Sequence, residues 1–212
     1  MDIPVDNKRV RTLFAGQGIA EFLTSKMNDY AEDLARWNPG GLLATSPDKV
    51  AAELLKRHGV MGLRIHEPDG TPDSVDRTVN LGREYSFHDV RRSVKVYRLA
   101  VPFTGDAGLF SIRPTTYTLN PPAGHVDNSG RRLTVEFVNP AGEAPDPEKI
   151  GKSFAEVLRS VNWHLDQHRD AVEGHNTRIA DLGPIQQRIA AIKAERDILS
   201  KIPLPKMSGS EG

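Results

Sequence analysis

The stretch PEKIGKSFAEVLRSVNWHLDQHRDAVEGHNTRIADL, residues 147–182, decides the fold of the C-terminal part of this chain. Apolar residues and histidines recur in it at alternating steps of four and three residues, which is typical of a helix with one buried seam. Asp146 and Pro147 suit the cap and the first position of that helix. The seam residues are Phe154, Leu158, Val161, Leu165, His168, Val172, His175, Ile179 and Leu182.

Gly183 and Pro184 interrupt the seam, which then continues through Gln186 and Ile189. Proline removes a helical hydrogen bond and clashes with the preceding turn, so the helix must kink there or reverse as a hairpin. We favour a kinked helix, because a two-residue break leaves little room for a loop. We therefore expect a helical arm over 146–201 and a flexible tail or linker over 202–212.

The seam of the arm has two interpretations, and the pattern does not choose between them. It could join a second copy of the chain or another protein, with the polar His168 and His175 restricting the register. It could also pack on the rest of its own chain, which needs apolar partners as well. Histidine in such a seam can also act as a pH-sensitive contact.

The remaining chain predicts helices followed by a sheet. A helix is expected over 9–37, and a second begins after Ser46, with Pro47 at its first position and Gly59 at its end. The segment 67–88 is expected to be a long loop with one short strand. The expected β segments are 94–103, 109–112, 115–119 and 133–137.

Because no long helix intervenes between these segments, the sheet should be antiparallel. The expected fold class is therefore α+β, with N-terminal helices, a central antiparallel β-sheet and a long C-terminal kinked or coiled-coil-like helix. Residues 1–140 would form the helical and β-sheet domain, and the arm would follow.

Composition excludes several classes of protein. The 212 residues contain no cysteine, which removes disulfides, thiolate nucleophiles and cysteine zinc sites, and is consistent with a cytoplasmic protein. Lysine plus arginine equals aspartate plus glutamate, 28 against 28, so overall charge predicts neither nucleic acid nor membrane as a partner. No stretch approaches the roughly 20 apolar residues that span a bilayer.

A local cluster of positive charge is the one feature that suggests nucleic acid or another polyanion. It consists of Arg91, Arg92 and Lys95 near one expected strand, and Arg131 and Arg132 after a turn. If the strands are neighbours, these side chains could meet phosphates. The alternative is an ordinary sheet edge, where positive charges prevent unwanted pairing.

The sequence contains no recognisable catalytic, metal or cofactor motif. His164 and His168 lie one helical turn apart, but neither Asp166 nor Asp170 shares their face as a third metal ligand, so we expect no metal site. Gly16-Gln17-Gly18 lacks the third glycine and the preceding strand of a dinucleotide site, so no cofactor is expected.

Several short stretches resemble a known group of proteins. They include VPFTGD at 101–106, RPTT at 113–116, NPP at 120–122, VNW at 161–163 and IPL at 202–204. In this order they resemble the N-terminal region of uncharacterised bacterial proteins that, in longer members, precedes a restriction-endonuclease-like domain. The resemblance covers roughly 90–205 and includes no Glu-x-Lys element, so it implies a non-catalytic half.

We therefore expect a non-enzymatic sensing, regulatory or oligomerisation module of a bacterial system, linked to a nuclease and to defence against phage. Its partner would be a protein or a second copy of itself, bound through the C-terminal helix. One alternative is the polyanion-binding module described above. A second is an enzyme whose site is assembled around loop histidines such as His66, His88 or His125.

Overall fold

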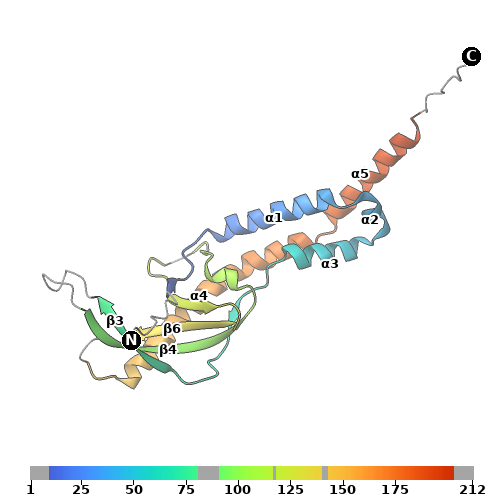
Figure 1. Cartoon of the computed structure of the whole chain (residues 1–212). Helices are drawn as coiled ribbons and strands as arrows, with labels where there is room; N and C mark the ends of the chain where they lie inside the picture. Colours follow the sequence, from blue (N-terminus) through green and yellow to red (C-terminus); the bar gives the residue numbers. More distant parts are fainter. Residues whose placement is uncertain (1–9, 81–90, 117, 140–142, 203–212) are drawn as a thin grey trace, which may run out of the picture. The chain divides into compact units, whose positions relative to one another are not determined.

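The computed structural model describes residues 10–80, 91–116, 118–139 and 143–202 (Figure 1). The chain forms two compact units: unit 1 holds residues 1–23 and 60–173, and unit 2 holds residues 24–59 and 174–212. Two long helices, α1 (Ile19–Arg36) and α4 (Pro147–Ala180), each contribute to both units. This division differs from the expected consecutive segments 1–140 and 146–201, because each of these helices supplies side chains to both cores.

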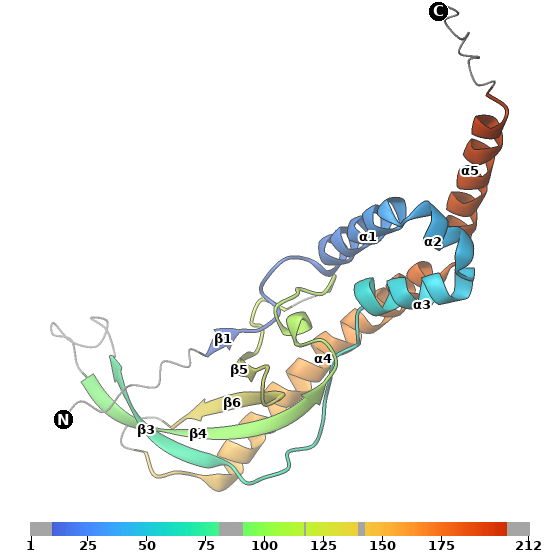
Figure 2. The same cartoon turned by 45° about the vertical axis from the view of Figure 1, so that its right-hand side comes forward.

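Unit 1 is built on an antiparallel sheet, as the sequence predicted, so the α+β class is confirmed (Figure 2). Its strand order is β1-β5-β6-β4-β2, and β3 pairs with β4 beside β2. The five strand pairings among the described residues are all antiparallel. The strands are β1 (Arg11–Thr12), β2 (Arg64–Ile65), β3 (Asp73–Asn80), β4 (Arg91–Thr104), β5 (Ala123–Asp127) and β6 (Arg132–Val138).

The 14-residue strand β4 organises the sheet, because both of its edges are paired. Alternate side chains of a strand point to opposite faces. Leu99, Val101 and Phe103 point to the face that joins the main core, together with Leu133 and Val135 of β6. In Figure 2, α4 runs along the sheet, and its residues Phe154, Val161, Leu165 and Val172 belong to the same core.

The long C-terminal helix is kinked, as the sequence predicted. The Asp146 carboxylate accepts hydrogen bonds from the backbone N–H groups of Glu148 and Lys149, at 2.9 and 3.3 Å, and so caps α4. The helix stops at Ala180, and α5 (Gly183–Ser200) starts after two residues. Pro184 lies in the first turn of α5, where its missing N–H costs no hydrogen bond.

Unit 2 is helical and includes the end of α4. Its other helices are α2 (Pro39–Ala44), α3 (Pro47–His58), α5 and most of α1. Ser46 and Pro47 stand at the expected start of α3, although the Ser46 side chain makes no capping hydrogen bond. The core of this unit consists of Tyr30, Leu34, Leu42, Val50, Ala51, Leu54, Ile179, Ile185 and Ile192.

Three local expectations were wrong. The helix expected over 9–37 begins only at Ile19, because Leu13, Phe14 and Gly16 donate backbone hydrogen bonds to Pro122, Phe110 and Ser111. The segment expected to be a strand at 109–112 includes the end of a 3-10 helix, η1 (Ala107–Phe110), capped by the side chain of Asp106. The described residues of 115–119 form no strand. The one strand expected within 67–88 is present as β3 and has eight residues.

Candidate functional site

The predicted positive cluster does not form an open patch in the described part of the chain. Arg132 makes a bidentate ion pair with Asp69, with N···O distances of 2.6 and 2.7 Å. Arg131, which has a φ of 49°, donates from its guanidinium to the carbonyl of Gly105 at 2.9 Å. Lys95 is exposed and stands opposite Asp76 in the register. The side chains of Arg91 and Arg92 lie outside the described part.

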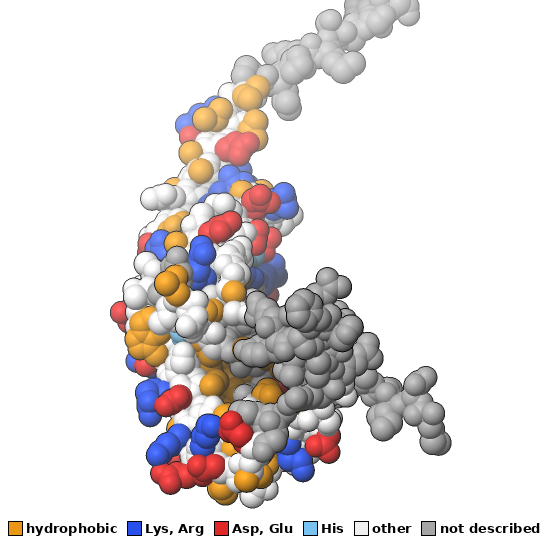
Figure 3. Space-filling model, turned by 90° about the vertical axis from the view of Figure 1, so that its left-hand side faces the viewer, with side chains coloured by type: hydrophobic (Ala, Val, Ile, Leu, Met, Phe, Trp, Pro, Cys, Tyr) orange, Lys and Arg blue, Asp and Glu red, His pale blue; other side chains and the backbone are white. Residues whose placement is uncertain are grey.

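The pKa values of the acidic partners agree with the pairing of Arg132 and of the neighbouring Arg98. The hydrogen bonds from Arg132 lower the pKa of Asp69, and the hydrogen bonds from Arg98 lower the pKa of Asp73. In both carboxyls the partner guanidinium favours the charged form more than the small burial disfavours it. On the face shown in Figure 3, blue and red side chains are interspersed over the described surface. The ion pairs of Arg132 with Asp69 and of Arg98 with Asp73 thus balance these charges.

A feature that the sequence analysis missed is an ion pair that crosses β4. Arg77 on β3 and Glu136 on β6 are joined by two hydrogen bonds of 2.8 Å each. The register places Arg77 opposite Val94 and Glu136 opposite Arg98, so the pair passes over Val96, which is fully buried. The hydrogen bonds to Glu136 raise the pKa of Arg77. The available signal was the alternation of Val75, Arg77 and Val79 in the sequence of β3, which predicts a charged residue between two β-branched ones on one face.

The predicted helix seam is buried within its own chain. Phe154, Val161, Leu165 and Val172 lie in the core of unit 1, and Leu158 packs against it. Ile179 lies in the core of unit 2, where Leu182 packs at the margin. The structure thus gives these side chains intramolecular partners, so a contact with a second chain through this seam would require them to unpack.

The two seam histidines and His164 are also buried, at 2% exposure or less. His164 Nδ1 lies 2.7 Å from the carbonyl oxygen of Ser160, and His175 Nε2 lies 3.1 Å from that of His58. A carbonyl oxygen only accepts, so each of these two nitrogens carries a proton and donates it. The opposite nitrogens, His164 Nε2 and His175 Nδ1, are buried and have no hydrogen-bond partner among the described residues.

His168 is poorly placed to carry a charge. Neither of its ring nitrogens has a well-formed hydrogen bond within the described residues, although the backbone of Ile112 gives partial compensation. Burial, together with the neighbouring His164, lowers the pKa of His168 to about 4. The ring is therefore neutral at pH 7, and it becomes a destabilising group when it is protonated.

Phe14 packs on both of these histidines from the N-terminal segment. Its ring stacks on His164 with a centroid distance of 4.7 Å and an interplanar angle of 7°, and lies 5.8 Å from the ring of His168. Phe14 has a φ of 56°, in the left-handed region. This conformation costs a bulky residue roughly 1–2 kcal/mol. Packing and hydrogen bonds around Phe14 must offset that cost.

Unit 2 contains a second polar cluster. His58 Nε2 lies 2.8 Å from a carboxylate oxygen of Asp33, and Arg57 is 3.7 Å from the same oxygen. The ring of Tyr30 meets that of His58 edge-on at 6.3 Å. Burial, with a smaller contribution from Asp181, raises the pKa of Tyr30. The Asp33–His58 pair joins α1 to α3, and its residues gave no motif in the sequence.

The loop histidines named for an enzyme do not come together where they are described. His66 hydrogen-bonds the hydroxyl of Thr104 at 3.0 Å, beside β2. His125 lies on β5 opposite Thr134, so β6 and β4 separate it from β2. His88 lies outside the described residues. No group of three or more potential metal ligands is found in the described ranges.

The last turns of α5 expose large apolar side chains. Ile198, Leu199 and Ile202 are 64%, 58% and 55% exposed, whereas Ile185 and Ile192 on the same helix are buried in unit 2. Every residue from Lys193 to Ser200 is exposed, and Figures 1 and 2 show no other helix beside this end of α5. We call residues 193–202 the α5 end.

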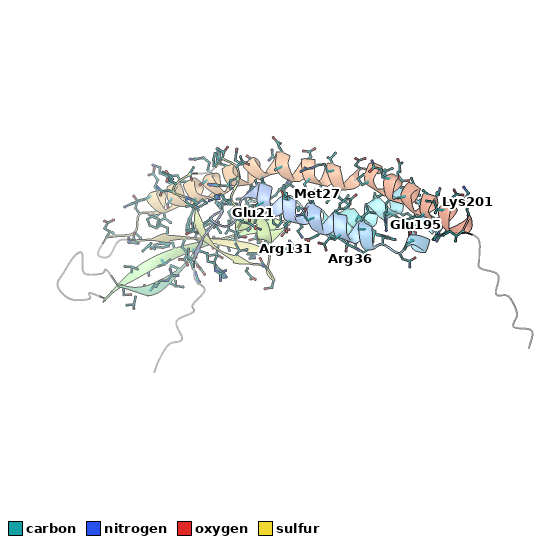
Figure 4. The ribbon with its side chains drawn as sticks, turned by 90° about the horizontal axis from the view of Figure 1, so that it is seen from above. Glu21, Met27, Arg36, Arg131, Glu195 and Lys201 are labelled. Atoms are coloured by element: carbon teal, nitrogen blue, oxygen red, sulfur yellow. The ribbon has the colours of Figure 1, made fainter. Side chains whose placement is uncertain are left out.

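Charged residues of both signs surround these apolar side chains. Figure 4 places Glu195 and Lys201 on the α5 end. Lys193, Arg196 and Asp197 belong to the same segment, and Lys201 pairs with Asp197 at 2.6 Å. The expected tail beyond residue 202 lies outside the described residues.

Two further findings bear on the class of protein. No helix among the described residues is both apolar and long enough to cross a membrane. Comparison of the chain with protein-family models, with curated proteins and with solved structures gives no match, so the resemblance to nuclease-linked bacterial proteins stays an expectation.

Proposed function

We propose that this protein is a non-enzymatic assembly module that associates with a second copy of itself through the α5 end. The observation that carries the proposal is the exposure of Ile198, Leu199 and Ile202 on a helix end that has no described neighbour. Three large aliphatic side chains exposed together on one segment indicate an interaction surface more strongly than scattered single ones.

The charges of the α5 end favour a second copy over an anionic partner. Lys193, Arg196 and Lys201 alternate with Glu195 and Asp197, so the surface offers both signs to its partner. A copy of the same segment carries the matching charges, and closed two-fold dimers are the commonest soluble oligomers. For a polyanion or an acidic membrane surface, the two carboxylates would offset most of the attraction of the three basic residues.

The contact should be weak unless other parts of the chain join it. Burying one aliphatic side chain contributes roughly 1.5–3 kcal/mol, and association costs roughly 4–15 kcal/mol. Three partly exposed side chains on each copy therefore support a dissociation constant in the micromolar range or weaker. The resemblance adds that, in longer relatives, such a dimer would bring two nuclease domains together.

The test is the mass in solution, measured by sedimentation velocity over a concentration series. The wild-type chain should shift from monomer to dimer as concentration rises. The double variant Ile198→Glu/Ile202→Glu should stay monomeric, because two buried carboxylates would oppose the contact. Met61→Glu is the matched control, since Met61 is 68% exposed but belongs to unit 1. A wild-type chain that is monomeric throughout contradicts the proposal.

A further inference from the structure

The contact of Phe14 with His164 and His168 combines three features that the fold alone does not require. The two imidazoles are buried on one face of α4, and three of their four ring nitrogens have no well-formed hydrogen bond among the described residues. The aromatic side chain that covers them has a left-handed backbone. Trp163 meets the ring of His164 edge-on, with a centroid distance of 4.9 Å.

We propose that Phe14, His164 and His168 form an acid-sensitive latch, in which protonation of His168 releases the segment Leu13–Gly16 from α4. While His168 is neutral, Phe14 packs against it as an apolar neighbour. A protonated His168 is a buried cation without an anionic partner, and it gains solvation only when the segment that covers it moves away.

Among the described residues, the groups around His168 include no anion that would stabilise its charge. From the N-terminal segment the ring faces Phe14, and from the segment after η1 it faces the backbone of Ile112. From α4 itself the titratable group that acts on it is His164, which disfavours a positive charge on His168. Among the described residues no carboxylate contributes to the electrostatics of His168. Protonation therefore has to be relieved by movement.

The segment Leu13–Gly16 is held by the burial of Leu13 and Phe14 in the core of unit 1 and by backbone hydrogen bonds to the loops beside it. β1 is two residues long, and among the described residues Leu13 donates to Pro122 at 2.8 Å, Phe14 to Phe110 at 2.6 Å and Gly16 to Ser111 at 2.8 Å. Release would also relax the left-handed φ of Phe14. In contrast, α4 keeps its own helical hydrogen bonds, and β4 is paired along both edges. Opening should therefore be local.

The size of the effect follows from linkage. With a pKa of about 4 for His168 in the closed state and 6.5 for an exposed histidine, the opening constant should rise about 20-fold between pH 7 and pH 5. The sign is fixed by the lowered pKa: the closed state binds the proton more weakly, so acid favours opening.

Hydrogen exchange read by mass spectrometry tests the latch on the whole chain, after correction for the intrinsic pH dependence of exchange. Peptides covering 11–18 should lose protection about 20-fold from pH 7 to pH 5, while peptides of β4 keep theirs. In His168→Leu, which has no proton to gain, protection of 11–18 should change less than about twofold. His66→Leu, the same replacement at an exposed histidine, should behave as the wild type does.

The wild-type comparison makes the test independent of whether the variant folds. Equal losses of protection in 11–18 and in β4 would show that acid unfolds unit 1 as a whole, and they would overturn the latch. Unchanged protection in 11–18 at pH 5 would overturn it as well. A full 20-fold loss in His168→Leu would assign the effect to another group. As a second readout, Trp163 emission in a Trp37→Phe background should change over the same pH range as the exchange.

Discussion

The ion pair between Arg77 and Glu136 allows a quantitative test of how burial changes the strength of one interaction. The perturbation is a double-mutant cycle of Arg77→Ala, Glu136→Ala and the double variant. The Glu136 side chain is 11% exposed and that of Arg77 is 39% exposed. Hydrogen bonds to charged groups contribute about 1.5–3 kcal/mol each, and partial exposure of Arg77 reduces the total. We expect a coupling free energy of about 2 kcal/mol.

Arg132 and Asp69 provide the matched control cycle in the same unit. They have the same bidentate geometry, but their side chains are 42% and 50% exposed. Exposed ion pairs contribute about 0–1 kcal/mol, because water screens the charges and the side chains lose conformational freedom. The expected difference between the two cycles therefore comes from burial and not from hydrogen-bond geometry.

The assay is urea denaturation at pH 7, followed by Trp163 emission in a Trp37→Phe background so that it reports on unit 1. Two compact units can unfold separately, so the transition must be shown to be two-state before free energies are compared. A coupling below about 0.5 kcal/mol for Arg77 and Glu136 would refute the reasoning. So would equal coupling in both cycles.

Three further predictions concern stability. Burial lowers the pKa of His168 to about 4, so the contribution of the neutral ring to the free energy of unfolding is present above about pH 6.5 and is lost as the pH falls to 4. Urea titrations should show that His168→Leu removes about 3 kcal/mol of this acid destabilisation, and less if unit 1 opens before it unfolds. Val161→Ala, at a fully buried position, should lower the free energy of unfolding by roughly 2–3 kcal/mol, whereas Val138→Ala, at 48% exposure, should cost under about 1 kcal/mol. Gly105→Ala should cost more than about 2 kcal/mol in thermal or urea unfolding, because Gly105 has a φ of 99° and a Cβ there would lie 2.2 Å from the carbonyl oxygen of Gly62; Gly62→Ala, with open space around its Cβ, is the control.

The long C-terminal helix was predictable because its signals are local. Asp146 caps it, and the steps of four and three residues from Phe154 to Leu182 define one apolar face. Pro184 marked the kink for the same reason, since the loss of an N–H group acts on the adjacent turn. The partner of that face was not predictable, because periodicity shows that a face is apolar without showing what covers it.

The N-terminal segment shows the opposite case. Local composition favoured a helix from residue 9, but contacts far along the chain decided otherwise, since Phe14 donates to Phe110 and its ring covers His164 and His168. The strand within 67–88 was expected to be short, because its charges resemble those of a loop, but β3 has eight residues. Its charges are instead satisfied across the sheet, where Arg77 reaches Glu136 and Arg98 reaches Asp73.

The sequence by itself determined the elements whose signals lie within one or two turns: the α+β class, the capped and kinked helix, and the buried alternation of β4 and β6. Only the tertiary structure decided the strand register, the pairing of the arginines and the burial of the histidines. The physical reason is the distance along the chain over which each interaction acts. Caps, prolines and periodicity act between neighbours in sequence, whereas the Arg77–Glu136 pair and the Phe14–His164 contact join residues 59 and 150 positions apart, brought together only by the folded chain.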